Sequence, residues 1–288
     1  MKNTFTKWFK KTFIPKAIGF YFNVFALIAK KKAGASLLSL ISKPRKGRIQ
    51  DFQRKMLNNC TFKETVPYKE LHIQTYHWVK PGRKILLCHG WESNSWRWRK
   101  LLKNLEDTNY YFIAMDGPAH GATTGNEATG LIYGEMIAAV VEKYQVEVII
   151  GHSFGGYGAL YYLAHFPKNS IKFMIVLASP DRWLDIAEQF YKALGVSSRL
   201  KDGIDLAFNE KYPQNQAFYS GTNFAKDIAI PGIVIHDVKD STNKIEEGRR
   251  IAESWKSSTL FETEGFEHAL QSPEVFSIIR KTLEKSIL

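Results

Sequence analysis

With 288 residues, of which 44% are hydrophobic and 24% charged, the chain can bury one large core, and its composition excludes a disordered, fibrous or multi-span membrane protein. The formal net charge of +12 is concentrated near the N-terminus, because residues 1–60 hold 14 Lys and Arg against one acid, whereas residues 61–288 hold 26 against 27. A near-neutral body gives little reason to expect a phosphate-binding groove, and no nucleic-acid partner is expected.

Residues 1–60 are expected to form a basic, aromatic-rich helical extension. Its apolar run AIGFYFNVFALIA, residues 17–29, is interrupted by Asn23 and is too short to span a bilayer. The basic region before this run is long for a secretory signal, and three lysines, residues 30–32, follow it where small neutral residues belong. The two cysteines provide no disulfide framework. We therefore expect a cytoplasmic protein, not a secreted one.

Two interpretations of this extension are open. It can pack an apolar stripe on the rest of the chain and leave its lysines in water. Alternatively, it can attach to the surface of an anionic membrane, because aromatic and apolar residues alternate with the lysines. The residues of this second hypothesis are Trp8, Phe9, Phe13, Ile14 and Ile18.

Beyond the extension, short apolar runs alternate with helical segments. The strand-like runs are LHIQTYHWV, KILLCHG, YYFIAMDG, VEVIIGHS, KFMIVLAS, GIVIHDV and STLFETEG. The helical segments between them include WRWRKLLKNL, GLIYGEMIAAVVEKY, YGALYYLAHF and IEEGRRIAESW. Nearly continuous apolar strands separated by helices indicate a doubly wound α/β fold with a mostly parallel sheet covered on both faces.

The alternation is broken once, over residues 181–228, where segments such as DIAEQFYKAL and GIDLAFNEKY predict a small helical insertion. An insertion after a strand of an open α/β sheet lies near the crevice where such sheets bind ligands, so we interpret it as a lid. The α/β core then comprises residues 61–180 and 229–288.

The stretch GHSFGG, residues 151–156, follows the strand VEVII and precedes a helix. Alone, G-x-S-x-G is a weak signal, but at a strand-to-helix turn it is the setting of a nucleophile elbow. Gly151 and Gly155 would let strand and helix approach closely, and the hydroxyl of Ser153 would stand at the positive end of the helix. Ser153 is therefore the candidate nucleophile.

A nucleophilic serine needs a base and a group that orients the base. In elbows of this type, an acid and then a histidine follow on loops after later strands. GIVIHDVKD offers Asp237 and Asp240, of which Asp240 is preferred because it lies further into the loop, and His268 follows the last strand. The expected oxyanion-hole donors are the backbone amides of Phe154, after the nucleophile, and Trp91, in the turn after KILLCHG.

Five motifs in this order resemble the α/β-hydrolase superfamily: HGW at 89–91, DGPAHG at 116–121, GHSFGG at 151–156, HDVKD at 236–240 and GFEH at 265–268. The resemblance runs from about Glu70 to Leu288 and leaves the extension uncovered. It implies a Ser153–Asp240–His268 triad, oxyanion amides on Trp91 and Phe154, and a lid after the sixth strand. His236-Asp237 in the acid loop departs from the family pattern and keeps Asp237 open as the acid.

The resulting hypothesis is a serine hydrolase of carboxylic esters that forms an acyl-enzyme with a small or lipid-like substrate. A thioesterase, a C–C bond hydrolase, a peptidase or a cofactor-free peroxidase is compatible with the same residues, and a binding module that retains the fold is the non-enzymatic alternative. No HExxH, CxxC or P-loop occurs, so neither a metal nor another cofactor is expected.

Overall fold

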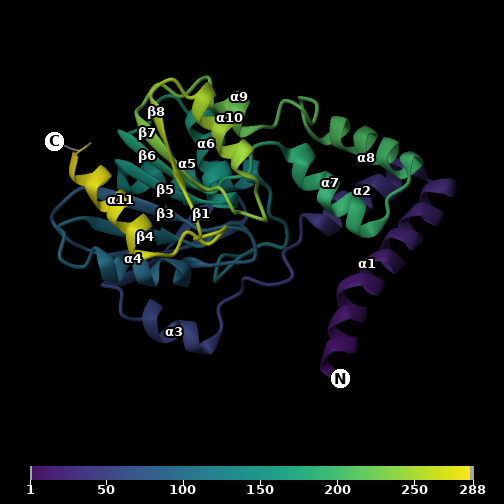
Figure 1. The fold of residues 1–288 in the computed structure, drawn as a ribbon, viewed down its shortest axis with the longest axis horizontal. Helices are drawn as coiled ribbons and strands as arrows, with labels where there is room; N and C mark the ends of the chain where they lie inside the picture. Colours follow the sequence, from purple (N-terminus) through teal and green to yellow (C-terminus); the bar gives the residue numbers. More distant parts are fainter. Residues whose placement is uncertain (1, 286–288) are drawn as a thin grey trace. The chain divides into compact units, whose positions relative to one another are not determined.

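The computed structural model describes residues 2–285, with side chains from residue 13 onward. These residues form two compact units (Figure 1). The first, which we call the helical unit, comprises Met1–Lys43 and Arg182–Ser220, and the second, the sheet unit, comprises Pro44–Asp181 and Gly221–Leu288.

The sheet unit contains an eight-stranded sheet in the order β1-β2-β4-β3-β5-β6-β7-β8. Six neighbouring strands run parallel to one another: β4, β3, β5, β6, β7 and β8. At one edge, β1 pairs antiparallel with β2, and β2 pairs antiparallel with β4. This confirms the predicted mostly parallel sheet. The strands are β1 Phe62–Tyr68, β2 Leu71–Trp78, β3 Lys84–Cys88, β4 Tyr111–Met115, β5 Val148–His152, β6 Phe173–Leu177, β7 Gly232–Asp237 and β8 Ser258–Thr263.

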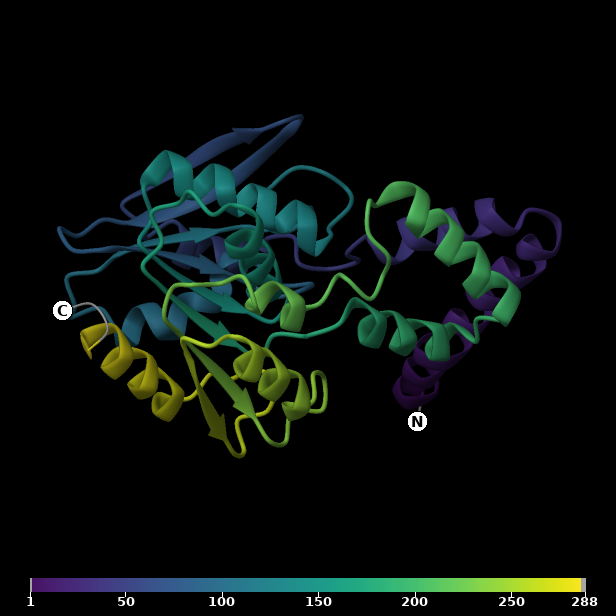
Figure 2. The same cartoon turned by 90° about the horizontal axis from the view of Figure 1, so that it is seen from above.

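Helices cover both faces of this sheet (Figure 2). Helices α4 and α11 pack together on one face, and α5, α6, α9 and α10 form a connected layer on the other. These helices are α4 Arg99–Asn104, extended at its start by the 3₁₀ turn η1 Ser95–Trp98, α5 Gly130–Tyr144, α6 Phe154–His165, α9 Gly221–Ala225, α10 Ile245–Ser254 and α11 Pro273–Lys285. A short helix, α3 Asp51–Leu57, precedes β1.

The central strands are apolar because both of their faces are covered. Every residue of β5, β6 and β7 is buried, and one large core cluster joins these strands to β3, β4, α4 and α11. Strand β1 is the exception and was not predicted. It lies at the edge of the sheet, is largely exposed and contains Pro67. Proline has no backbone N–H, and an edge strand tolerates it because one side of such a strand has no neighbouring strand to bond.

The helical unit consists of α1 Lys2–Ile28, α2 Lys30–Ile41, α7 Trp183–Leu194 and α8 Ser198–Lys211. The sequence predicted helices in both segments but treated them as an extension and a separate lid, whereas the structure packs them on one another. Their shared core is Phe22, Ala26, Ala33, Leu37, Ala187, Tyr191, Leu194, Leu200 and Ile204. Within the described residues, no helix is long and apolar enough to cross a membrane.

Polar contacts join the two segments as well. Asn23, which interrupts the apolar run, donates to the carbonyl of Gly195 at 2.8 Å and accepts from the amide of Ser197 at 2.9 Å. Arg199 donates to the carbonyl of Ala26 at 2.8 Å. These contacts satisfy backbone groups of α1 and of the α7–α8 turn, so the first part of the predicted extension shares one folded unit with most of the insertion. Residues 44–60, which were predicted to belong to the extension, are part of the sheet unit.

Two glycines allow α2 and α8 to touch. A Cβ on Gly34 would lie 2.1 Å from the carbonyl carbon of Gly203, so nothing larger than glycine fits. We expect Gly34→Leu to destabilise the helical unit by about 1–3 kcal/mol through overpacking. Thermal unfolding measures this loss, and Ala35→Leu, at the exposed neighbouring position, is the matched control. Equal stability of the two variants would contradict the close packing.

Candidate active site

Ser153 occupies the sharp turn between β5 and α6. Its φ of +51° and ψ of −121° are a conformation that residues with a side chain rarely adopt, and such strain concentrates at functional sites. The surrounding glycines make the turn possible. A Cβ on Gly155 would lie 2.4 Å from the carbonyl oxygen of Cys88, and one on Gly151 would lie 2.7 Å from the Cα of Gly156.

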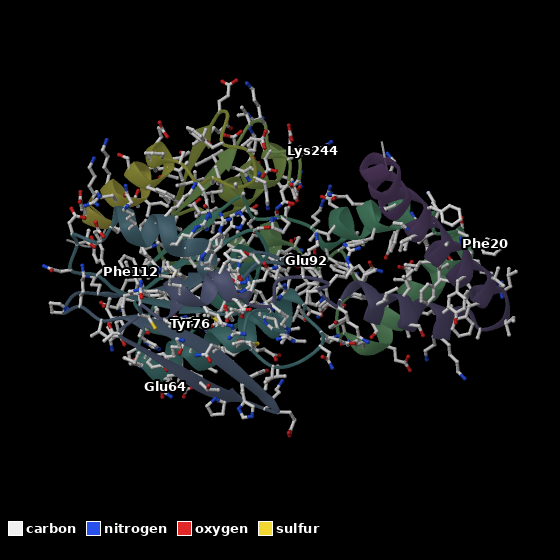
Figure 3. All side chains as sticks on the ribbon, turned by 90° about the horizontal axis from the view of Figure 1, so that it is seen from below. Phe20, Glu64, Tyr76, Glu92, Phe112 and Lys244 are labelled. Atoms are coloured by element: carbon white, nitrogen blue, oxygen red, sulfur yellow. The ribbon has the colours of Figure 1, made fainter. Side chains whose placement is uncertain are left out.

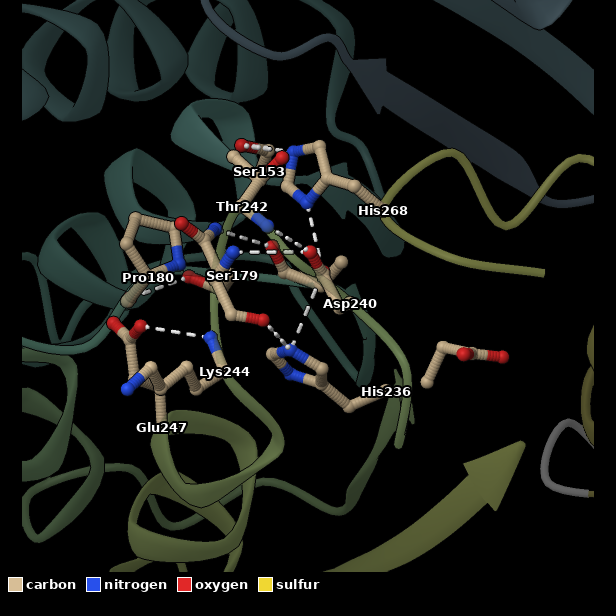
Figure 4. Close-up of polar contacts among 12 residues, drawn as sticks. Ser153, Ser179, Pro180, His236, Asp240, Thr242, Lys244, Glu247 and His268 are labelled. Carbon is tan, nitrogen blue, oxygen red and sulfur yellow. Dashed lines mark hydrogen bonds and ion pairs between the residues drawn. The ribbon is translucent and has the colours of Figure 1, made fainter. Parts of the chain in front are cut away.

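His268 connects this serine to a carboxylate (Figure 4). Its Nε2 lies 3.1 Å from Ser153 Oγ, and its Nδ1 lies 2.8 Å from Asp240 Oδ2. The carboxylate fixes the tautomer: Nδ1–H donates to Asp240, so Nε2 accepts the serine proton. The structure thus brings together the three side chains that the sequence singled out, from the loops after β5, β7 and β8.

Asp240 is buried, and its Oδ1 accepts backbone N–H groups from Thr242 at 2.8 Å and Asn243 at 3.0 Å. Beneath it, His236 Nε2 lies 3.5 Å from Oδ2. Burial alone would raise the pKa of Asp240, but hydrogen bonds from His236 and His268, together with the Asn243 amide, outweigh it and hold the pKa below its usual range. Asp240 therefore stays ionised beside the imidazole.

Asp237, the alternative acid, has a different position. It accepts hydrogen bonds from the amides of Lys239, Gly265 and Phe266 and from the hydroxyl of Thr263. It therefore ties the loop after β7 to the loop that carries His268. Burial acts to raise the pKa of Asp237, but these donors hold it below its usual range. Asp240, not Asp237, contacts the histidine.

The depressed pKa of Asp237 predicts a pH-dependent stability. A carboxylate whose pKa is lower in the folded state stabilises the protein above its unfolded pKa of about 4, and this stability is lost as the pH falls through the folded pKa. We expect Asp237→Asn to lower Tm at pH 7 and to differ less from wild type at pH 3. Circular dichroism melts over this range test it, and a Tm difference that stays constant with pH would contradict it.

The predicted oxyanion-hole residues lie next to the serine. Phe154 is the first residue of α6, and the ring of Trp91 packs edge-on against the ring of Phe154 at 5.3 Å. Gly90 brings the Trp91 turn to the elbow, since a Cβ on Gly90 would lie 3.1 Å from the Cβ of Ser153. Within residues 2–285, no acceptor is found for the backbone N–H of Trp91 or Phe154, so both donors are available to a substrate.

A pocket of about 360 Å³ opens onto Ser153 and His268. Its remaining walls come from the end of β5, from the loops after β3, β7 and β8 and from η1. These residues are Gly90, Trp91, Ser93, Arg97, His152, Ser241, Thr242, Glu267 and Ala269. In the part of the chain that the structure describes, no group of three or more His, Cys, Asp or Glu could hold a metal ion.

Three residues with a role around the site were not predicted to have it. Arg97 donates to the carbonyl of Ala269 at 2.6 Å, and burial, together with repulsion from Arg99, lowers the pKa of its guanidinium to about 9. His152 lies 2.9 Å, through Nε2, from the carbonyl of His268, and His236 supports Asp240. No spacing rule links the positions of these histidines to the His268 loop, so the sequence did not assign them to the site.

Comparisons with known proteins agree with this architecture. A model of the alpha/beta hydrolase fold matches residues 84–212. A bifunctional esterase/perhydrolase of Acinetobacter calcoaceticus is 24% identical over 255 residues, which cover 71% of this chain and 90% of that protein. A solved structure of a bromoperoxidase from Bacillus anthracis has a TM-score of 0.60 at 15% identity and covers 78% of this chain and 100% of its own.

Other relatives match over shorter stretches. A putative esterase/lipase of Mycoplasma pneumoniae is 28% identical over 117 residues, or 40% of this chain, and the match spans 43% of that protein. A serine hydrolase-like protein of Danio rerio is 33% identical over 114 residues, or 37% of this chain and 34% of its own length. The chain thus spans less than half the length of these two relatives.

Proposed function

We propose that the chain is a member of the α/β-hydrolase superfamily and a serine hydrolase of carboxylic esters, because a model of this fold matches residues 84–212 and the chain is similar to esterases and hydrolases. The observation that carries the proposal is the continuous hydrogen-bonded path from Asp240 through His268 to Ser153, with the serine on a strained elbow at the floor of a pocket.

In the first half of the reaction, His268 Nε2 takes the proton of Ser153 as Oγ attacks the ester carbonyl carbon. The backbone amides of Phe154 and Trp91 stabilise the negative charge that develops on the carbonyl oxygen. His268 then donates its proton to the leaving alcohol, and an acyl-enzyme on Ser153 results. Asp240 stabilises the imidazolium because its pKa is held low and it stays ionised.

In the second half, water replaces the alcohol. His268 removes a proton from the water, the hydroxide attacks the acyl carbonyl, and Ser153 leaves with the proton that His268 returns. The 360 Å³ pocket is of a size for a small acyl or alcohol group, so a small-molecule or lipid-like acyl ester is the proposed substrate class.

A second candidate activity follows from the names of two similar proteins, a perhydrolase and a bromoperoxidase. An acyl-enzyme can be attacked by hydrogen peroxide in place of water, which would release a peracid and needs no cofactor. Thioester, C–C bond and peptide hydrolysis use the same nucleophile, and the described side chains favour none of them over esters.

Hydrolysis of p-nitrophenyl esters with acyl chains of two to twelve carbons tests the proposal. We expect turnover, with a burst of one p-nitrophenol per enzyme where deacylation is slow. Added hydrogen peroxide separates the second candidate, because only a perhydrolase then forms peracid. A folded protein that binds these esters without turnover would be a binding module and would contradict the proposal.

A further inference from the structure

Helix α1 has an exposed apolar face, which we call the outer face. Phe20, Leu27 and Ile28 are 70%, 66% and 86% exposed. Four other large apolar side chains of α1 are exposed with them: Phe13, Ile14, Tyr21 and Val24. At about 100° per residue, positions 13, 20, 24, 27 and 28 fall within a sector of about 100°, so these side chains lie on the same side of the helix. Phe20, which is labelled in Figure 3, is one of them.

The opposite face of the same helix is already covered. Phe22 and Ala26 belong to the core of the helical unit, and a Cβ on Gly19 would lie 1.8 Å from the carbonyl oxygen of Leu194. The outer face is therefore not the stripe that holds the unit together. A helix that is apolar on both faces is normally buried on both, and an exposed patch of this kind marks a surface that binds another body.

The charge near the outer face identifies the kind of partner. Residues 1–43 contain nine lysines and no acid, and residues 182–220 add five basic and five acidic side chains, which gives the helical unit a net charge of +9. Lys16 on α1 and Lys31 and Lys32 at the start of α2 are exposed close to the apolar side chains in sequence. An apolar face on a unit of net positive charge complements a bilayer with anionic headgroups, whereas a second, equally positive copy would be repelled.

We propose that the outer face of α1 binds the surface of an anionic phospholipid membrane. Phe20, Leu27 and Ile28 enter the boundary between headgroups and acyl chains, and the lysines contact the phosphates. The helix lies in the plane of the membrane, which agrees with the finding that no described helix can span one.

The structure changes which residues carry this surface. Ile18, one of the residues expected from the sequence, is partly buried against the core of the helical unit and does not belong to the outer face. Phe13 and Ile14 are exposed, and the side chains of Trp8 and Phe9 lie outside the described residues. The strongest contributors, Phe20, Leu27 and Ile28, were not singled out.

Co-sedimentation of the full chain with vesicles tests the proposal. Vesicles of 30% phosphatidylglycerol in phosphatidylcholine should bind the protein, and pure phosphatidylcholine vesicles should bind it at least about tenfold more weakly. The triple variant Phe20→Ser, Leu27→Ser, Ile28→Ser should lose about tenfold or more in partition coefficient. The matched control is Phe52→Ser with Leu206→Ser, which removes exposed apolar side chains from α3 and α8.

Hydrolysis of a soluble ester by each variant separates membrane binding from catalysis, since none of these residues lines the pocket. Binding of the triple variant at the wild-type level would overturn the proposal, as would equal binding to neutral vesicles. Size-exclusion chromatography adds a further outcome: a wild-type dimer that the triple variant dissociates would show that a second copy covers the outer face, and would overturn the proposal too.

Discussion

Replacement of Ser153 by alanine should lower kcat for a soluble ester by about 10⁴-fold or more, because the variant has no nucleophile for the acyl-enzyme. Folding should be nearly unaffected. Alanine meets the same backbone strain at φ +51° as serine does, and the hydrogen bond that the change removes is the one to His268. Steady-state kinetics and circular dichroism measure the two quantities.

Ser241→Ala is the matched control, because Ser241 lines the same pocket and takes no part in the hydrogen-bonded path. Its kcat should stay within about threefold of wild type. If Ser153→Ala retained substantial hydrolysis while Ser241→Ala lost it, the assigned nucleophile would be wrong.

The second large effect concerns the acid. Asp240→Asn should reduce kcat by about 10³–10⁴-fold, because an amide in this place no longer stabilises the imidazolium and can hold His268 in the wrong tautomer. Asp237→Asn should instead lower Tm and reduce kcat much less than Asp240→Asn does, since Asp237 accepts hydrogen bonds from loop amides and from the hydroxyl of Thr263. Comparison of kcat and Tm for the two variants distinguishes these roles.

The pair serves as its own control, because both residues lie at or just after the end of the same strand and both changes are Asp to Asn. A greater loss of kcat in Asp237→Asn than in Asp240→Asn, with both variants folded, would reverse the assignment and restore the alternative that the sequence left open.

Much of the sheet could be predicted because its central strands are covered on both faces and therefore read as apolar runs. β5, β6 and β7 are examples. The elbow was predictable for a related reason: Ser153 adopts a strained turn that needs glycine at 151 and 155, and those glycines are visible in the sequence. Edge strand β1 was missed, since an exposed strand with Pro67 carries little hydrophobic signal.

Contacts between segments that are far apart in the sequence were harder to predict. The packing of α1 and α2 on α7 and α8 depends on Gly34 and Gly203, which are 169 positions apart and carry no local pattern that links them. In the sequence, Asp240 was preferred over Asp237 only because it lies further into the loop. The structure shows that the carboxylate of Asp237 instead accepts hydrogen bonds from the amides of Gly265 and Phe266. The roles of Arg97 and His236 around the site likewise depend on contacts with residues that are far away in the sequence or that no local pattern identifies.

One measurement tests the central claim most directly. The wild-type protein is incubated with a fluorophosphonate, which reacts only with an activated serine, and the labelled peptide is located by mass spectrometry. A single phosphonylated residue, Ser153, with labelling sharply slowed in His268→Ala, is the predicted result. No label on the folded wild-type protein, or a label on a different serine, would contradict the proposed hydrolase.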